Sequence, residues 1–379
     1  MSTNTARQSE VSRPADPAAL RWRISTVCLL LAIAALATFM VASHRASKPE
    51  ASQKQLRVAL FVNGTLGDKS FYDSAAKGLK RAHASLGIRD RVIEAGFDPS
   101  RWEAALADLV EGQEFDIIVT GTFTMVPIVE KLAAQFPASR FVVFDAAVDY
   151  SRCSCANVYS VLFRQNEGAY LAGFLATRLA RPMTAAGASP VLAVVGGMQI
   201  PVIDDFIVGF TAGAKAADAK ARVMQQYANS FTDPAAGKEI AKAMLGKDGA
   251  SVIFHAAGAT GQGVMEAAAE ARRYVIGVDT DQFALYQASN PQLAAYIASS
   301  VVKNVDIAIA RAIALHHAQG LQYGSKESLG LAEQGIGLAW RSAVLDRAPA
   351  ELTQELEAVQ ARIISGDLKV PTARKSGGA

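Results

Sequence analysis

A cluster of polar and aromatic residues, Gly67-Asp-Lys-Ser-Phe-Tyr-Asp73, follows closely after the apolar run Val58–Val62. Within four residues the cluster offers a carboxylate, an ammonium group, a hydroxyl and an aromatic ring. In open α/β sheets, the loop between the carboxyl end of a strand and the next helix is where small ligands bind. Two interpretations stay open: Asp68 and Phe71 contact a ligand, or Asp68 or Ser70 caps a helix and Phe71 packs in its core.

Polar residues also follow other apolar runs that have the length and composition of strands. Phe144-Asp145 ends one such run, and Asp279-Thr-Asp-Gln282 follows Tyr274–Val278. Carboxylates at strand ends accept hydrogen bonds from vicinal hydroxyl groups, as sugar and ribose recognition requires. The alternative for Asp279 is a structural Asx turn. Lys303 is predicted just inside the helix after the next strand, where a lone lysine is normally solvated.

A glycine-rich turn, Gly258-Ala-Thr-Gly-Gln-Gly263, follows the strand predicted at Ser251–Ala256. Its backbone N–H groups are able to cradle an oxygen-rich ligand. The order of the glycines differs from that of a dinucleotide-binding turn, and no matching ribose-binding acid follows it. The turn therefore predicts a ligand-facing loop and no dinucleotide cofactor.

Enzyme signatures are mostly missing. The sequence contains no Walker-type G-x-x-x-x-G-K-[ST] stretch, no H-E-x-x-H and no G-x-S-x-G, and its five histidines are scattered. No catalytic residue, cofactor or metal is predicted. A metal-dependent nucleoside hydrolase is a less favoured alternative that would use four carboxylates, Asp68, Asp73, Asp279 and Asp281. A net charge of +3 over 379 residues, without a basic block, argues against nucleic acid as a partner.

Two series of apolar runs alternate with amphipathic stretches, as in βαβ units that form parallel sheets. In the first series, the predicted strands are Arg57–Val62, Val92–Ala95, Phe115–Thr120, Phe141–Asp145 and Asn157–Phe163, and the helices are Ser70–Leu86, Ser100–Val110 and Val126–Gln135. In the second, the strands are Val191–Val195, Arg222–Tyr227, Ser251–Ala256 and Tyr274–Val278, and the helices are Gly168–Leu179, Asp204–Ala216, Pro234–Leu245 and Gly261–Ala271. The predicted fold class is α/β, with two doubly wound lobes.

The chain from Gln292 onward is too short for a third lobe, so we expect it to return to the first lobe and then to the second. A strand is predicted at Leu293–Ser299, and helices at Val301–Gln319 and Ala350–Ile364. The expected lobe boundaries are therefore 57–163 with 280–305 for lobe 1, and 164–279 with 306–366 for lobe 2, followed by a tail at 367–379.

The N-terminal region has the composition of a membrane anchor. Residues 1–24 are polar and arginine-bearing, and Ser25–Ser43 is free of charge over about the length that a helix needs to cross a bilayer. An uncleaved anchor with a cytoplasmic tail is favoured over a cleaved signal, for which Val41-Ala-Ser43 is a candidate site. Cys28 lies too early in the apolar run for a lipoprotein. A polar linker at 44–56 then leads to a body outside the cytoplasm, either tethered or released after cleavage.

Two of the three cysteines, Cys153 and Cys155, share one short segment. Their spacing leaves open a small-ring disulfide, half a metal site or two loop thiols. Zinc is disfavoured because neither a second cysteine pair nor a nearby histidine supplies the remaining ligands.

Many blocks, in this order, resemble the basic membrane protein family, the purine-nucleoside-type substrate-binding proteins of ABC transporters. The matching blocks are Asp68–Phe71, Phe144-Asp145, Glu167–Gly173, Val195–Gly197 with Pro201, Phe206 with Gly209-Phe210, Ser230–Asp233, Ala257-Gly258 with Gly261, Ile276–Gln282, Ser300 with Lys303, and Gly335–Leu338. The resemblance covers about residues 56 to 340. It implies a type I periplasmic-binding-protein fold, in which two Rossmann-like lobes close on a ligand.

The resemblance also implies roles for particular residues. Phe71 would stack on a base, Asp279 and Lys303 would hold ribose hydroxyls, and Asp145 would add a polar contact from lobe 1. The further ligand residues that it implies are Asn63, Asp68, Thr122, Ala257 and Gly258. Where nucleoside-binding members often have an aspartate, this chain has Asn63, so its base preference is expected to differ. Where a second aromatic platform would precede the glycine-rich turn, it has His255-Ala256, so one face of the base would be held by imidazole or by nothing aromatic.

The function that follows is a non-catalytic, extracytoplasmic receptor for a nucleoside or a similar ribosylated or sugar-like molecule. Its expected partners are this small molecule, an ABC permease and, through the N-terminal segment, the membrane, while the body is expected to be monomeric. The alternative is a membrane-tethered sensor that uses the same fold to report its ligand to a partner.

Overall fold

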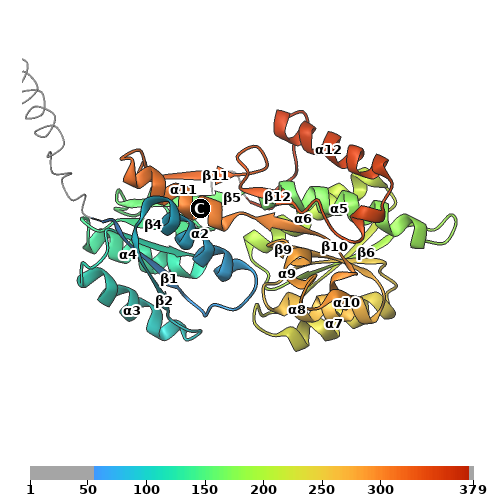
Figure 1. Cartoon of the computed structure of the whole chain (residues 1–379), viewed down its shortest axis with the longest axis horizontal. Coiled ribbons are helices and arrows are strands. Elements are labelled where there is room, and N and C mark those ends of the chain that lie inside the picture. The colour runs from blue at the N-terminus through green and yellow to red at the C-terminus, as the bar shows by residue number, and fades with distance from the viewer. Residues whose placement is uncertain (1–54, 375–379) are drawn as a thin grey trace, which may run out of the picture. The chain divides into compact units, whose positions relative to one another are not determined.

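The computed structural model describes residues 55–374, whose strands form two six-stranded sheets, one in each of two lobes (Figure 1). The first sheet has the order β11-β5-β4-β3-β1-β2, with β1 (Arg57–Val62), β2 (Arg89–Glu94), β3 (Ile117–Gly121), β4 (Phe141–Phe144), β5 (Val158–Phe163) and β11 (Ser325–Leu329). The second has the order β12-β10-β9-β8-β6-β7, with β6 (Val191–Gly196), β7 (Arg222–Tyr227), β8 (Val252–Ala256), β9 (Tyr274–Asp279), β10 (Ile297–Lys303) and β12 (Ile336–Leu338). Neighbouring strands of these sheets run parallel, except for the antiparallel pair β10–β12. The prediction of an α/β fold with two doubly wound lobes is confirmed.

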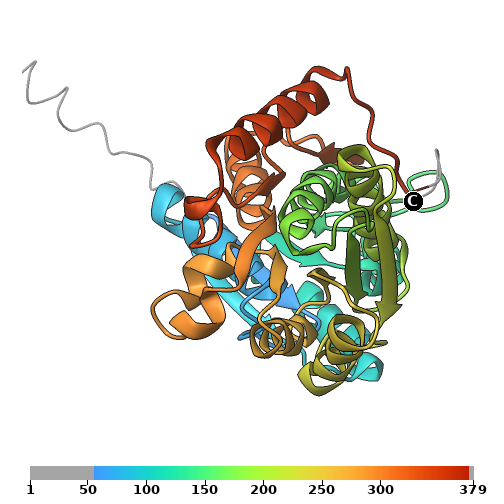
Figure 2. The same ribbon diagram turned by 90° about the vertical axis from the view of Figure 1, so that its right-hand side faces the viewer.

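Helices cover the sheets. Those of lobe 1 are α2 (Phe71–Leu86), α3 (Pro99–Glu111), α4 (Val126–Gln135) and α11 (Val305–His317). Those of lobe 2 are α5 (Gln165–Ala180), α6 (Pro201–Ala217), α7 (Pro234–Gly246), α8 (Thr260–Glu270), α9 (Gln282–Tyr286), α10 (Pro291–Ala294) and α12 (Ala350–Ser365). Figure 2 shows α12, in red, packed against the outside of α5.

The side chains of β1 show why the central strands are apolar throughout. Successive side chains of a strand point to opposite faces of the sheet. Leu60 therefore packs in the core beneath α2 and α11, whereas Phe61 packs with Leu106 of α3 and Val129 of α4. Because both faces are covered, the strand is a continuous buried hydrophobic run rather than an alternating one.

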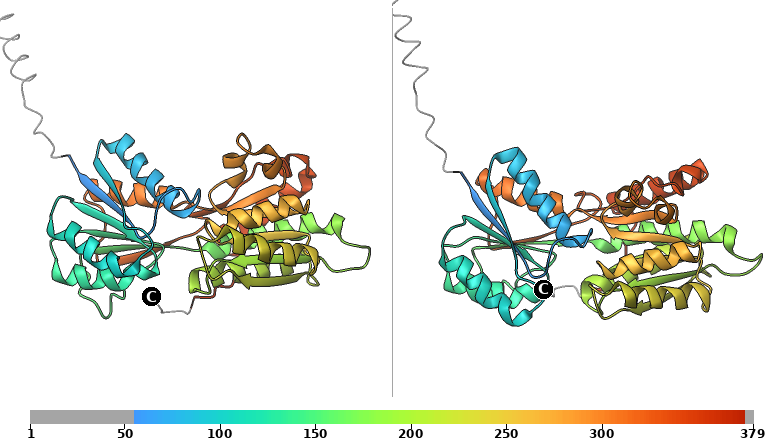
Figure 3. Two further views of the ribbon diagram at one scale, coloured as in Figure 1. Left: turned by 90° about the horizontal axis from the view of Figure 1, so that it is seen from below. Right: turned by 60° about the horizontal axis from the view of Figure 1, so that its bottom comes forward.

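The expected division into lobes is wrong for the C-terminal part of the chain. β10 pairs in parallel with β9, so the chain as far as Lys303 belongs to lobe 2 and not to lobe 1. After it, α11 and β11 return to lobe 1, and β12 and α12 return to lobe 2. The chain thus passes between the lobes three times: after β5, after β10 and after β11 (Figure 3).

Two local predictions were also wrong, for identifiable reasons. The strand predicted to stop at Ser299 continues to Lys303, because Val301 and Val302 are β-branched and extend the pairing, so that the helix begins only at Val305. The strand β11 was not predicted. Its sequence, Ser-Lys-Glu-Ser-Leu, is that of an exposed edge strand and carries little apolar signal.

The predicted tail at 1–24, anchor at 25–43 and nearly all of the linker at 44–56 lie outside the described residues. Within 55–374, no helix combines the length and the apolar character that a bilayer span requires. Cys153 and Cys155 are joined in a disulfide, which resolves the alternatives for these two residues.

Candidate functional site

Three charged residues meet where strands of the two sheets end. Asp145 follows β4 of lobe 1, while Asp279 and Lys303 are the last residues of β9 and β10 of lobe 2. The two aspartates occupy equivalent strands of their sheets, and both have a left-handed backbone, with φ of 62° and 66°. Aspartate tolerates this region better than most residues, but holding it there still costs free energy. Regular strand geometry therefore does not account for the backbone of these two aspartates, and the contacts of their side chains must help to hold it.

Lys303 forms an ion pair with Asp145 across the two lobes. The distance from Lys303 Nζ to Asp145 Oδ1 is 2.5 Å, and the two side chains are only 2% and 10% exposed. Three aromatic ring centres lie 5.2 to 5.6 Å from the same Nζ, those of Phe71, Phe163 and Phe206. The ammonium group is thus held by one carboxylate and by the faces of aromatic rings. Removing either charge would leave the other buried and unpaired.

A second polar pair crosses the lobes beside the first. Ser70 Oγ donates to Asp279 Oδ2 at 2.5 Å, and Thr280 Oγ1 donates to the carbonyl oxygen of Lys69 at 3.1 Å. Ser70 and Lys69 belong to the loop before α2 in lobe 1, whereas Asp279 ends β9 and Thr280 follows it in lobe 2. The structure therefore shows the lobes in direct polar contact at their strand ends.

Burial raises the pKa of Asp279 from its ordinary value of 3.8 to about 6, while the charge of Lys303 and the hydrogen bond from Ser70 act in the opposite direction. The folded protein therefore takes up a proton at pH values at which the unfolded chain has already lost it. As a result, the contribution of this carboxyl to the free energy of unfolding is largest below about pH 4, falls as the pH rises to about 6, and is constant above that.

We expect the substitution Asp279→Asn to remove this pH dependence, because an amide does not titrate. Relative to wild type, the variant should gain on the order of 3 kcal/mol between about pH 4 and about pH 7, since one pKa unit corresponds to about 1.4 kcal/mol. Urea unfolding of both proteins at a series of pH values measures the difference, and the subtraction cancels the slopes of other carboxylates. Parallel pH profiles would show that Asp279 is not buried in the ligand-free protein.

Asp68 acts as a helix cap. Its carboxylate accepts hydrogen bonds from the backbone N–H groups of Ser70, Tyr72 and Asp73 at 2.9 to 3.1 Å. Burial raises the pKa of Asp68, and these three hydrogen bonds act against that shift. Of the two interpretations of this residue, the structure supports the cap at the start of α2, so that its expected ligand contact is not supported by the geometry.

Asn63 and Thr122 come together in lobe 1. Asn63 Nδ2 donates to Thr122 Oγ1 at 3.2 Å and to Thr124 Oγ1 at 2.9 Å, and Asn63 Oδ1 accepts from the Tyr72 hydroxyl at 3.0 Å. The sequence did not single out Thr124 or Tyr72 as partners, since nothing in their spacing indicates this contact. The Nδ2 donors and one lone pair of Oδ1 are thus engaged within the protein, which fixes the orientation of the amide at the end of β1 and leaves its oxygen with a second lone pair.

The glycine-rich turn of lobe 2 lies against an aromatic side chain. Ala257 is buried, and Gly258 has a left-handed backbone with φ of 55°. A Cβ atom on Gly258 would come within 3.6 Å of the Phe231 side chain, and one on Gly197 within 2.3 Å of its ring. Phe231 therefore lies over the loops after β6 and β8. The sequence pointed to this stretch through the Ser230–Asp233 block, in which Phe231 stands two residues before Asp233, the N-cap of α7.

The hypothesis that the His255 imidazole holds a base is wrong. The side chain is completely buried, and its Nε2 lies 3.0 Å from Gln282 Oε1. Burial lowers its pKa to about 4, against the effect of the Gln282 hydrogen bond, so the ring is neutral at physiological pH. A Cβ on Gly261 would lie 2.0 Å from its Nδ1, which explains the glycine at that position. His255 is thus a core residue behind the site.

Two doubly wound lobes, joined by three crossovers and meeting through charged residues at their strand ends, define a bilobal solute-binding protein. The chain belongs to the family described as ABC transporter substrate-binding protein, PnrA-like, which matches residues 55–374. The members of this family are substrate-binding proteins of ABC transporters and not enzymes.

Similar proteins agree with this assignment. The CD4+ T-cell-stimulating antigen of Listeria monocytogenes is 30% identical over 333 residues, covering 84% of this chain and 89% of the relative. Basic membrane protein D of Borreliella burgdorferi is 30% identical over 328 residues, covering 86% and 90%. A crystal structure of an ABC transporter solute-binding protein from Aeropyrum pernix superposes with a TM-score of 0.73 at 27% identity, covering 83% of this chain and 94% of that one. The expected type I periplasmic-binding-protein fold and the family resemblance are confirmed.

Proposed function

We propose that this protein binds a nucleoside, or a similar ribosylated small molecule, between its lobes and delivers it to an ABC permease. The observation that carries the proposal is the convergence of Asp279, Lys303 and Asp145 beside the ring of Phe71. A vicinal diol needs an acceptor and a donor next to each other, and a carboxylate beside an ammonium group provides both. The base needs an apolar face, which the half-buried ring of Phe71 offers.

In this proposal the ligand replaces the bonds that the lobes make with each other. A ribose hydroxyl takes the place of Ser70 at the carboxylate of Asp279, and Lys303 donates to the same diol while it keeps Asp145 as its counter-ion. Phe71 of lobe 1 and Phe231 of lobe 2 are the candidate platforms for the two faces of the base. Closure around the ligand then exchanges one set of cross-lobe contacts for another.

Asn63 sets the expected difference in base preference. Its amide both donates and accepts, whereas the aspartate that the family resemblance implies at this position accepts only. Together with Thr122, it is proposed to face the polar edge of the base. The backbone of Ala257 and Gly258 is proposed to contact the ligand from lobe 2.

The proposed location is the extracytoplasmic side of the membrane, where a substrate-binding protein meets its permease. Residues 25–43 would tether the body or would be removed as a signal. The body is proposed to act as a monomer, because one chain supplies both walls of the site.

Native mass spectrometry of the purified protein tests the proposal. We expect an added mass equal to that of a nucleoside, which is lost when the protein is unfolded and refolded, and which returns on addition of that nucleoside. A panel of purine and pyrimidine nucleosides, their free bases and ribose then identifies the preferred ligand by titration calorimetry. Binding of free sugars with no response to any nucleoside would overturn the nucleoside assignment.

Phe71→Ala separates a stacking role from a structural one. The ring lies 5.4 Å from those of Phe144 and Tyr72, centre to centre, and is only half-buried. If it stacks on a base, the variant should lose about 1–3 kcal/mol of binding free energy with a small change in melting temperature. A core residue would instead cost about 3–5 kcal/mol of stability. Melting curves with and without ligand measure both, and Phe97→Ala, at a side chain that is 56% exposed, is the control. A large drop in melting temperature with unchanged affinity would refute stacking.

A further inference from the structure

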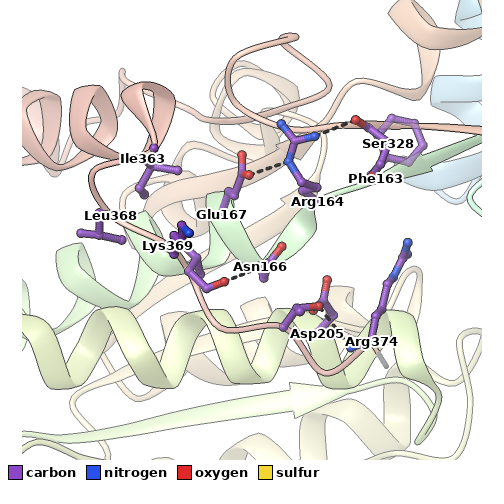
Figure 4. A pocket seen from close by; sticks show the side chains of 13 residues that line it. Phe163, Arg164, Asn166, Glu167, Asp205, Ser328, Ile363, Leu368, Lys369 and Arg374 are labelled. Atoms are coloured by element: carbon purple, nitrogen blue, oxygen red, sulfur yellow. Dashed lines mark hydrogen bonds and ion pairs between the residues drawn. The ribbon is translucent and has the colours of Figure 1, made fainter. Parts of the chain in front are cut away.

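A pocket of about 410 Å³ lies at the crossovers between the lobes, beside the segment that follows α12 (Figure 4). Phe163 and Ser328 of lobe 1, Asn166 and Asp205 of lobe 2, and the C-terminal stretch as far as Arg374 line it. The volume is within the range of small-molecule sites. Phe163 borders both this pocket and the strand-end site, since its ring also lies 5.2 Å from Lys303 Nζ, whereas the other residues that line the pocket are not part of the strand-end site.

The C-terminal stretch is fixed to lobe 2 by specific hydrogen bonds. Asn166 Nδ2 donates to the carbonyl oxygens of Val370 and Pro371 at 3.3 and 3.0 Å. Asp205 Oδ1 accepts from Thr372 Oγ1 at 2.6 Å and from the backbone N–H of Ala373 at 2.9 Å. These bonds hold the wall of the pocket in place and bring Arg374 to it.

The two carboxylates of the pocket already have donors. Glu167 accepts from Arg164 Nε at 2.6 Å and from the backbone N–H of Leu331 at 2.8 Å. Asp205, besides its bonds to the C-terminal stretch, accepts from Gln165 Nε2 at 2.8 Å. Both carboxylates are therefore already hydrogen-bonded within the protein, and the pocket does not need a cation to satisfy them.

The two arginines of the pocket differ in this respect. The Arg164 guanidinium is engaged by Glu167, by Glu333 and by the carbonyl oxygen of Ser328. In contrast, Nη2 of Arg374 is shielded from solvent and has no hydrogen-bond partner within residues 55–374. In Figure 4 the Arg374 side chain extends from the C-terminal stretch toward Phe163. A buried donor on a charged group is costly to leave unpaired, so the pocket lacks an acceptor, and a negatively charged one fits best.

The rest of the lining indicates what carries that negative charge. Four apolar side chains contribute to the wall, those of Phe163, Ile363, Leu368 and Val370. A bare inorganic anion would leave most of this volume and apolar surface unused. We propose that the pocket is a binding site for a small organic monocarboxylate, whose carboxylate pairs with Arg374 and whose apolar part lies against these side chains.

Benzoate is the probe, and benzamide is its uncharged counterpart of the same shape. Binding of each to the full-length protein, kept in an uncharged detergent, is measured by saturation-transfer NMR and by calorimetry. We expect benzoate to bind in preference to both benzamide and inorganic phosphate. Arg374→Gln should lower the affinity for benzoate by about tenfold or more, because it removes the charge-assisted hydrogen bond. Arg374→Lys should retain part of the affinity, since it keeps the charge.

Arg222→Gln is the matched control, because it makes the same charge change at an exposed position on β7, outside the pocket. It should bind benzoate as wild type does. Equal binding of benzoate and benzamide, or an equal loss in Arg374→Gln and Arg222→Gln, would overturn the proposal. If benzoate does not bind at all, the proposal is also overturned, and the pocket is then one that only water fills. Nucleoside titration of the same samples keeps the two proposals apart, since each can fail while the other stands.

Discussion

Lys303→Met is expected to destabilise the protein by about 3–5 kcal/mol, the cost of breaking a buried ion pair by removing one partner. Methionine has a similar length and packs well among aromatic rings, so the loss of van der Waals contacts is small. The free energy lost is that of a buried Asp145 carboxylate without its counter-ion. Urea unfolding measures it, and Lys326→Met, on the exposed face of β11, controls for the loss of a lysine charge.

The double variant Lys303→Met/Asp145→Asn makes this test specific. Asparagine tolerates the left-handed backbone that Asp145 adopts, so the second change removes the charge without straining the chain. We expect it to recover most of the lost stability while nucleoside binding stays weak, because the donor to the diol is gone. If Lys303→Met alone is as stable as wild type, the two lobes do not hold Asp145 and Lys303 together in the absence of ligand.

Asp279→Asn is expected to lower the affinity for a nucleoside by about tenfold to a hundredfold. A charge-assisted hydrogen bond contributes about 1.5–3 kcal/mol, and each 1.4 kcal/mol corresponds to a factor of ten in affinity. A 2′,3′-dideoxynucleoside lacks the diol, so its weaker binding should change much less. Titration calorimetry of both ligands against both proteins gives the coupling between this carboxylate and the diol.

Asp281→Asn is the control for this experiment. Asp281 lies two residues away, and its carboxylate caps α9 by accepting from the backbone N–H of Ala284, a role that asparagine can also fill. The control should bind the nucleoside as wild type does. Equal losses for the nucleoside and its dideoxy analogue in Asp279→Asn would show that Asp279 does not contact the diol, and the ribose assignment would fall with it.

The sequence was sufficient for the fold class because the strands are long apolar runs separated by helices of regular period. It was insufficient for lobe membership near the C-terminus, because that depends on which strand β10 pairs with, and strand pairing is a non-local choice. The same limit explains the misplacement of Lys303. A helix pattern and a buried strand both place apolar residues at Val301, Val302 and Val305, and only the pairing with β9 distinguishes them.

The sequence pointed to the charged residues of the candidate site but not to the residues with which they form hydrogen bonds. Residues at strand ends are identifiable one at a time, so Asp145 and Asp279 stood out. Their bonds to residues of the opposite lobe, such as Ser70 to Asp279, join positions that are 209 residues apart, which no spacing rule reaches. His255 shows the opposite failure: its type suggested a ligand contact, but its complete burial behind Gly261 makes it part of the core.

The three passages of the chain between the lobes also constrain how the protein is made. Synthesis proceeds from the N-terminus, and the sheet of lobe 1 lacks β11 until Leu329 has been added, while that of lobe 2 lacks β12 until Leu338. The two sheets are therefore completed within a few residues of each other, one at Leu329 and the other at Leu338. No single cut between residues 164 and 338 yields two fragments that each carry a whole lobe. A chain that stops before Ser325 therefore lacks the last strand of both sheets, so that one truncation leaves both lobes incomplete.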